Sequence, residues 1–106
     1  MEISNLEQRV LFALLRLHPN GYGVSVRDEL LSTAGEDHSL GSIYATLDRL
    51  ARKGFVTPRQ GEATAERGGR AKLYFTITGE GRRALDESTR VVDRLRKGLR
   101  GFGVAT

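Results

Sequence analysis

Hydrophobic residues along this chain follow two different spacings, and each spacing predicts a different kind of element. In four stretches they recur every three or four positions, which is the period of an amphipathic α-helix. Near the middle of the chain they alternate with polar residues, with Leu73, Phe75 and Ile77 on one face, as in a half-buried strand. The pattern predicts helices over residues 4–17, 25–34, 41–53 and 79–102, and strands over residues 55–62 and 72–78.

Capping residues and glycines mark the ends of these elements. Ser4, followed three residues later by Glu7, has the pattern of a capping box at the start of the first helix. Gly54 follows the third helix, where a glycine commonly ends a helix. The glycine-rich residues 21–23 are expected to form a short loop, with Ser25 as the N-cap of the second helix.

The order of the elements predicts the fold class. Three helices followed by a two-stranded hairpin describe a winged helix-turn-helix, in which the third helix enters the DNA major groove and the hairpin is the wing. We expect an α+β, mainly α, fold. A winged helix-turn-helix DNA-binding domain would occupy residues 1–78, and a C-terminal dimerisation helix with its tail would occupy residues 79–106.

The charge of the chain is concentrated in its central part. The net charge is +4, yet residues 1–40 carry three basic and six acidic side chains, whereas residues 41–83 carry nine basic and four acidic ones. The basic excess therefore covers the third helix and the hairpin. A concentrated basic surface favours a polyanionic partner, most often nucleic acid, and the alternative is an ordinary solvated surface rich in lysine and arginine.

The third predicted helix has two unlike faces. Ile43, Leu47 and Leu50 cluster on the side that must face the core. The opposite side is small in its first half and basic in its second half. Small residues let a helix approach base edges closely, and arginine can pair with phosphate or guanine, although a plain solvated face is the competing interpretation. The candidate recognition residues are Ser42 and Arg49 on this outer face, and Tyr44 and Thr46 on its flanks.

The loop of the hairpin carries cations on both sides of a Gly-Gly tip. Arginine on a protruding tip suits a narrow and electronegative minor groove. The competing interpretation is a glycine turn with incidental arginines. The candidate wing contacts are Arg67, Arg70 and Lys72.

The last predicted helix has an apolar stripe with a heptad-like spacing. It follows a domain that could already close its own core, so the stripe either folds back on that domain or pairs with a second copy. Pairing is favoured, together with the largely apolar first helix, because a long exposed apolar stripe is a liability in a monomer. The candidate dimer-interface residues are Leu85, Val91, Val92, Leu95 and Leu99.

The sequence offers little for catalysis or metal binding. It has no cysteine, and His18 and His38 stand alone, without metal-ligand spacing around them. No nucleophile with a matching base is evident, so we expect no enzyme activity, no cofactor and no metal. No apolar run approaches the ~20 residues of a membrane span, and the N-terminal residues lack the order of a signal peptide. We expect a soluble cytoplasmic protein without a membrane partner.

Three stretches, LFALLRLHPNGYGVSVRDEL, GSIYATLDRLARKGFV and GGRAKLYFTITGEGRRAL, together resemble the PadR-like family of bacterial winged-helix transcription regulators. The resemblance covers roughly residues 5–95. It rests on a linked set of motifs, which are Gly21-Tyr22-Gly23, Gly41 with Ile43-Tyr44, Lys72 with Tyr74-Phe75, and Thr78 with Gly81.

The resemblance implies a homodimer joined through the N-terminal and C-terminal helices. Members of the family usually repress transcription from palindromic operators, and many are released by a small-molecule effector. Ala45 stands where many relatives have proline, and the chain lacks the tryptophan that some multidrug-binding relatives use to stack flat ligands. The single C-terminal helix matches the smaller subgroup of the family.

The sequence thus predicts a dimeric, sequence-specific regulator that binds double-stranded DNA at a palindromic operator, most simply as a repressor of a nearby operon. The alternative is a winged helix that serves as a protein-interaction or RNA-binding module without operator recognition. A small enzyme is the rival from another class, and it lacks a catalytic set.

Overall fold

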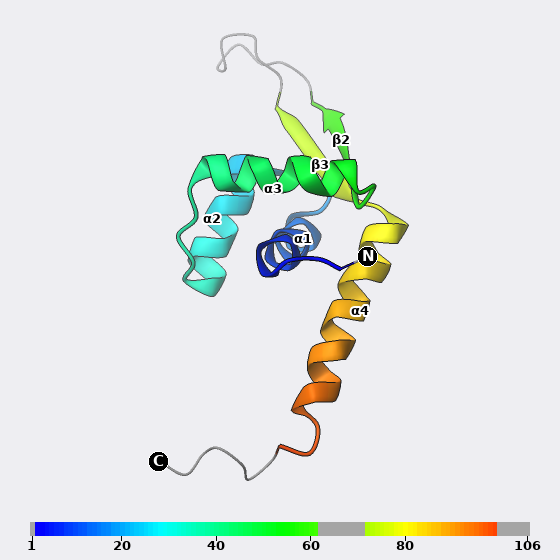
Figure 1. The fold of residues 1–106 in the computed structure, drawn as a ribbon. Coiled ribbons are helices and arrows are strands. Elements are labelled where there is room, and N and C mark those ends of the chain that lie inside the picture. The colour runs from blue at the N-terminus through cyan, green and yellow to red at the C-terminus, as the bar shows by residue number, and fades with distance from the viewer. Residues whose placement is uncertain (1, 62–71, 100–106) are drawn as a thin grey trace.

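The computed structural model describes residues 2–61 and 72–99, which form a helical unit with a small sheet on one side and a helix that projects from it (Figure 1). The elements in chain order are α1 (Asn5–Leu17), β1 (Gly21–Tyr22), α2 (Gly23–Ala34), α3 (Leu40–Arg52), β2 (Val56–Gln60), β3 (Leu73–Ile77) and α4 (Gly79–Arg96). Three helices, an antiparallel β2–β3 pair and a C-terminal helix confirm the predicted winged helix-turn-helix.

The helix ends follow from side chains that satisfy free backbone groups. At the start of α1 the Ser4 hydroxyl accepts from the Glu7 amide at 3.1 Å, and the Glu7 carboxylate accepts from the Ser4 amide at 2.8 Å. This confirms the predicted capping box. Ser39 caps α3 by accepting from the Ser42 amide, and Gly54 follows α3 with a positive φ of 79°.

The prediction of a loop at residues 21–23 is wrong. Gly21 and Tyr22 form the short strand β1, which pairs antiparallel with β3, so the sheet has three strands in the order β1-β3-β2. Helix α2 begins at Gly23, and Ser25 therefore lies inside its first turn instead of capping it. The Ser25 hydroxyl still accepts from the Tyr22 amide at 3.0 Å. Two residues are too few to show a strand period, which explains the error.

The core lies between the three helices of the helix-turn-helix and one face of the sheet. Phe75 of β3 is buried there and Ile77 packs against it, whereas Leu73 of the same predicted face lies beyond the core and is exposed. The largest contributions come from α1 and α3. The buried helix residues include Val10, Leu11, Leu14, Val26, Ile43, Leu47 and Leu50.

Helix α4 belongs to the core at its start and leaves it afterwards. Leu85 is 1% exposed and packs in the core of its own chain, so its assignment to a dimer interface is wrong. Gly81 lies so close to the backbone of Phe55 that a Cβ atom there would collide with the Phe55 carbonyl oxygen. The helix ends at Arg96, so Leu99 lies beyond it and the predicted heptad is cut short. The remaining stripe is exposed and consists of Val91, Val92 and Leu95, followed by Leu99.

Among the helices in residues 2–61 and 72–99, none combines the length and the apolar character needed to cross a lipid bilayer. The same ranges contain no group of His, Asp and Glu side chains placed to hold a metal ion.

Candidate nucleic-acid interface

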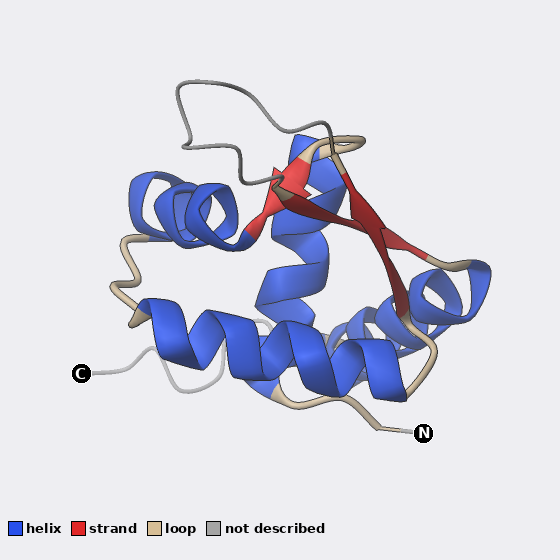
Figure 2. Ribbon diagram, turned by 90° about the horizontal axis from the view of Figure 1, so that it is seen from above, coloured by secondary structure: helices blue, strands red, loops and turns tan. Residues whose placement is uncertain are grey.

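The outer face of α3 is small at its start and charged near its end. Ser42 and Ala45 are exposed on the first two turns, and Arg52 is exposed on the last turn, where it pairs with Asp48 at 2.6 Å. Helix α3 and the sheet share one end of the molecule, as the view from that end shows (Figure 2). This end therefore presents a narrow helix surface beside a strand surface, which is the shape that a winged helix offers to a nucleic-acid groove.

Tyr44 takes its position from a glycine in another helix. Gly23 is buried at the start of α2, and a Cβ atom there would collide with the Tyr44 ring. The absence of a side chain at residue 23 thus lets Tyr44 lie against α2 while the residue stays exposed as a whole. Gly21 has the same role towards Leu14, whose methyl group would be 2.7 Å from an added Cβ.

Thr46 is not available to read a base, so its prediction as a recognition residue is wrong. It is fully buried, and its hydroxyl donates to the Ser42 carbonyl at 2.8 Å and accepts from the Arg49 guanidinium at 3.0 Å. Residue 46 lies one turn from Ile43 and from Leu50 along the helix, and this places it at the edge of the core face. The hydroxyl therefore orders Arg49 instead of facing a ligand.

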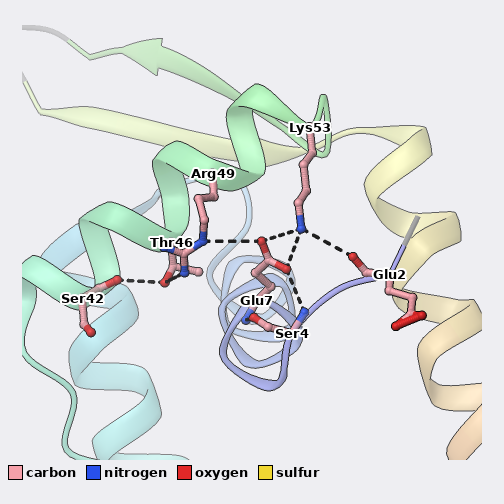
Figure 3. Close-up of polar contacts among 7 residues, drawn as sticks. All are labelled: Glu2, Ser4, Glu7, Ser42, Thr46, Arg49 and Lys53. Carbon is pink, nitrogen blue, oxygen red and sulfur yellow. Dashed lines mark hydrogen bonds and ion pairs between the residues drawn. The ribbon is translucent and has the colours of Figure 1, made fainter.

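Arg49 is half-exposed, and its guanidinium leans towards α1 instead of standing away from the helix (Figure 3). Its side chain is 49% exposed, donates to Thr46, and has its Nε atom 3.8 Å from the Glu7 carboxylate. The position predicted from the helical period is correct, but the side chain is shared between solvent and a contact to α1.

Glu7 is a buried carboxylate that connects α1 with α3. It is 2% exposed, and the Lys53 ammonium donates to both of its oxygens at 2.8 Å. Burial raises the pKa of Glu7, but the Lys53 hydrogen bonds, the Ser4 amide and the charges of Lys53 and Arg49 outweigh it, so the pKa lies below its ordinary value. Sequence reasoning found only the cap. The signal was available, because residue 7 shares the apolar face of Val10, Leu11 and Leu14.

Two tyrosines and two cations form a row at the base of the wing. Tyr22, Tyr74 and Arg59 are register partners across β1, β3 and β2. The tyrosine rings meet edge to face at 5.8 Å, Arg59 lies 5.0 Å from the Tyr74 ring centre, and the Lys72 ammonium lies 4.0 Å from the Tyr22 ring centre. Such contacts order a cation without neutralising it. Sequence reasoning missed Arg59, because the row exists only once β1 joins the sheet.

Within residues 2–61 and 72–99, no carboxylate pairs with Arg59 or Lys72. Arg59 donates to the Pro19 carbonyl and the Asn20 side chain, which are both uncharged. The ion pairs in the described part of the chain involve other cations. Of the three predicted wing residues, the structure thus places Lys72, while Arg67 and Arg70 lie outside the described residues.

A groove of about 520 Å³ lies between the N-terminal segment and α4. Ile3 and Gln8 line one side, and Val91 and Val92 line the other. The Gln8 side chain donates to the Ser88 hydroxyl at 3.0 Å and so ties α1 to α4. Val91 and Val92 belong both to this groove and to the exposed stripe of α4, and α4 lies on the side of the molecule away from the wing (Figure 1).

A third helix with an exposed outer face, together with the β2–β3 wing, defines this chain as a winged helix-turn-helix protein. The sequence model described as the transcriptional regulator PadR-like family matches residues 11–87, and the chain belongs to this family. The resemblance drawn from the sequence is thereby confirmed. No curated protein matches the chain.

Solved structures of transcriptional regulators share the fold. A transcriptional regulator from Clostridium thermocellum has a TM-score of 0.74 at 18% identity, with 92% of each chain covered. A PadR family regulator from Clostridium difficile has a TM-score of 0.74 at 16% identity, with 92% of this chain and 96% of that chain covered. Bacillus subtilis PadR in complex with operator DNA has a TM-score of 0.70 at 23% identity, with 81% of this chain and 48% of that chain covered.

Proposed function

We propose that this protein is a homodimeric regulator that binds double-stranded operator DNA through α3 and the wing, and that it represses transcription from a palindromic site. The observation that carries the proposal is the juxtaposition at one end of the molecule. There the outer face of α3 and the β2–β3 hairpin, with Arg59 and Lys72, lie at the same end of the molecule (Figure 1), and no carboxylate of the described chain neutralises these two ordered cations. The DNA complex of the Bacillus subtilis relative supports the same use of this fold.

Different parts of this surface have different tasks in the proposal. Ser42 and Tyr44, near the start of α3, would read base edges, since recognition helices read bases mainly with their N-terminal residues. Arg49 would reach a base or a phosphate by leaving its contact to Glu7. The wing cations would hold phosphates or the minor groove, and they are Arg59, Arg67, Arg70 and Lys72.

The apolar surface of α4 would join two copies. Val91, Val92 and Leu95 are exposed there, and Leu99 follows them. Two copies related by a twofold axis would place their α3 helices about one turn of DNA apart, ~34 Å, which requires a palindromic operator. The groove of about 520 Å³ beside α4 has the size of a small-molecule site, so it could accept an effector that alters the dimer.

Selection of bound genomic fragments by the purified protein tests the proposal. We expect recovery of a short inverted repeat, and we expect a duplex with that repeat to bind at least about 1,000-fold more tightly than a scrambled duplex. An RNA-binding module would instead prefer single-stranded or structured RNA competitors, and a protein-interaction module would bind no duplex above background. Either result would contradict the proposed binding to an operator.

The wing base should contribute affinity more than sequence preference. The double variant Arg59→Gln/Lys72→Gln is expected to weaken operator and scrambled DNA alike, and to flatten the slope of log affinity against log salt by about 1.8, the value for two lost phosphate contacts. The matched control is Arg90→Gln/Arg94→Gln on α4, which removes the same charge next to Glu87. If the salt slope of the wing variant is unchanged, the sheet does not contact DNA.

A further inference from the structure

Lys53 lies at the basic end of α3, yet its positive charge is paired with a carboxylate inside the protein. A lysine ammonium has three hydrogens to donate. The Lys53 ammonium contacts three acceptors of the chain, which are the two carboxylate oxygens of Glu7 at 2.8 Å and the Glu2 carbonyl at 3.4 Å (Figure 3). The side chain is only 27% exposed. Every donor of this cation is therefore directed at the N-terminal part of the chain.

The contrast with Arg52 shows what the contact to Glu7 changes. Arg52, one residue earlier, is exposed and pairs with an exposed aspartate, so a phosphate can compete for it in water. Glu7 is almost completely buried, and a buried carboxylate that lost its cation would carry an uncompensated charge. A phosphate therefore competes poorly for Lys53.

Glu7 also sets the position of Arg49. The Glu7 carboxylate lies 3.8 Å from the Arg49 Nε atom, and Thr46 holds the other end of the guanidinium. These contacts come from α1 and from α3, so they fix the flank of α3 relative to α1. The same carboxylate closes the cap of α1, which leaves it little freedom to move.

Resting on the DNA-binding function proposed above, we infer that Glu7 limits the sequence-independent affinity of the protein for DNA by withholding Lys53, and supports its specificity for the operator by ordering Arg49. Attraction between cations and phosphates is independent of sequence and supplies essentially all non-specific binding. A recognition helix that offers fewer free cations binds random DNA more weakly, so a larger share of its affinity depends on sequence. Glu7 is thus a positioning residue that never touches DNA.

The test measures binding to a random-sequence duplex and to a selected operator duplex across a salt titration. Glu7→Gln frees Lys53, so we expect its slope on random DNA to steepen by about 0.9 and its affinity there to rise about 5–10-fold near 0.1 M salt. A free Lys53 strengthens both duplexes alike, so the expected fall in the ratio of operator to random affinity comes from Arg49, which loses its contact to Glu7. The matched control is Glu36→Gln, which removes one charge from another glutamate that accepts from a cation of α1, Arg9, at 2.6 Å. The control should stay within about twofold of the wild type on random DNA.

The Lys53→Gln variant tests the same inference without relying on Glu7→Gln being folded. In the otherwise wild-type chain it should leave random-DNA binding within about twofold, and in the Glu7→Gln background it should cancel the gain. Circular dichroism confirms that each variant is folded at the temperature used. A loss of about 0.9 in slope on Lys53→Gln alone, or a Glu7→Gln slope equal to that of Glu36→Gln, would overturn the inference. Wild-type protein that binds no duplex would instead refute the proposed function.

Discussion

A Leu95→Asp variant is expected to sediment as a monomer at micromolar concentration and to bind operator DNA at least about 100-fold more weakly than the wild type. Leu95 is 70% exposed on α4, next to the groove that the N-terminal segment lines. An aspartate buried at the proposed dimer interface would lack a partner, and burying an unpaired charge costs several kcal/mol. A monomer can occupy only one half-site, so the gain from simultaneous binding of two half-sites disappears.

Leu31→Asp is the matched control for this change. Leu31 is also an exposed leucine on a helix, but it lies on α2 and not on the α4 surface. We expect this variant to remain a dimer with unchanged operator affinity. Sedimentation velocity and circular dichroism decide the case. If the wild type is a monomer at micromolar concentration, or if Leu95→Asp remains a dimer, α4 does not form a dimer interface.

The second large effect is expected for Arg49→Ala, which should cost about 1–3 kcal/mol on the operator and relax the preference at one position in each half-site. Random DNA should weaken less, because Glu7 and Thr46 hold the guanidinium in the absence of a specific partner. Competition binding to operator and scrambled duplexes at matched salt measures both effects.

Arg49→Lys separates the two roles that Arg49 can have. Lysine keeps the charge but cannot form the paired hydrogen bonds of a guanidinium. A base-reading arginine predicts that Arg49→Lys loses operator affinity while it keeps random affinity. Equal weakening of both duplexes by Arg49→Ala would instead assign Arg49 to a phosphate. Wild-type binding by a folded, dimeric Arg49→Ala would show that α3 is not the recognition helix.

The helices of this fold could be predicted because their apolar spacing is strong and their ends carry caps. The faces of α1 and α3 were correct, since a 13-residue helix with a consistent apolar face has few alternative packings. The two-residue strand β1 could not be found in the same way, because its pairing with β3 depends on contacts far apart in the sequence. The row of Tyr22, Tyr74 and Arg59 could not be predicted for the same reason.

Side-chain roles were harder to predict than backbone elements. The helical period placed Thr46 on a flank, but only the packed structure shows that this flank is covered. Leu85 fits a heptad as well as it fits a core, and the close approach of α4 to Phe55 decides for the core. For Glu7, the cap pattern accounts for the residue by itself, whereas its second contact, to Lys53, joins residues that are 46 positions apart in the sequence.

The close contact between Gly81 and the Phe55 backbone has a mechanical meaning. Gly81, at the start of α4, packs directly on the Phe55 backbone with no room for a side chain between them, so we expect the junction between α4 and the rest of the chain to be stiff. If two copies are joined through α4, this stiffness fixes how far apart their α3 helices stand. One base pair added between two half-sites moves them by about 3.4 Å and turns them around the DNA axis. We therefore expect the protein to discriminate between operators by the spacing of their half-sites as well as by their sequence.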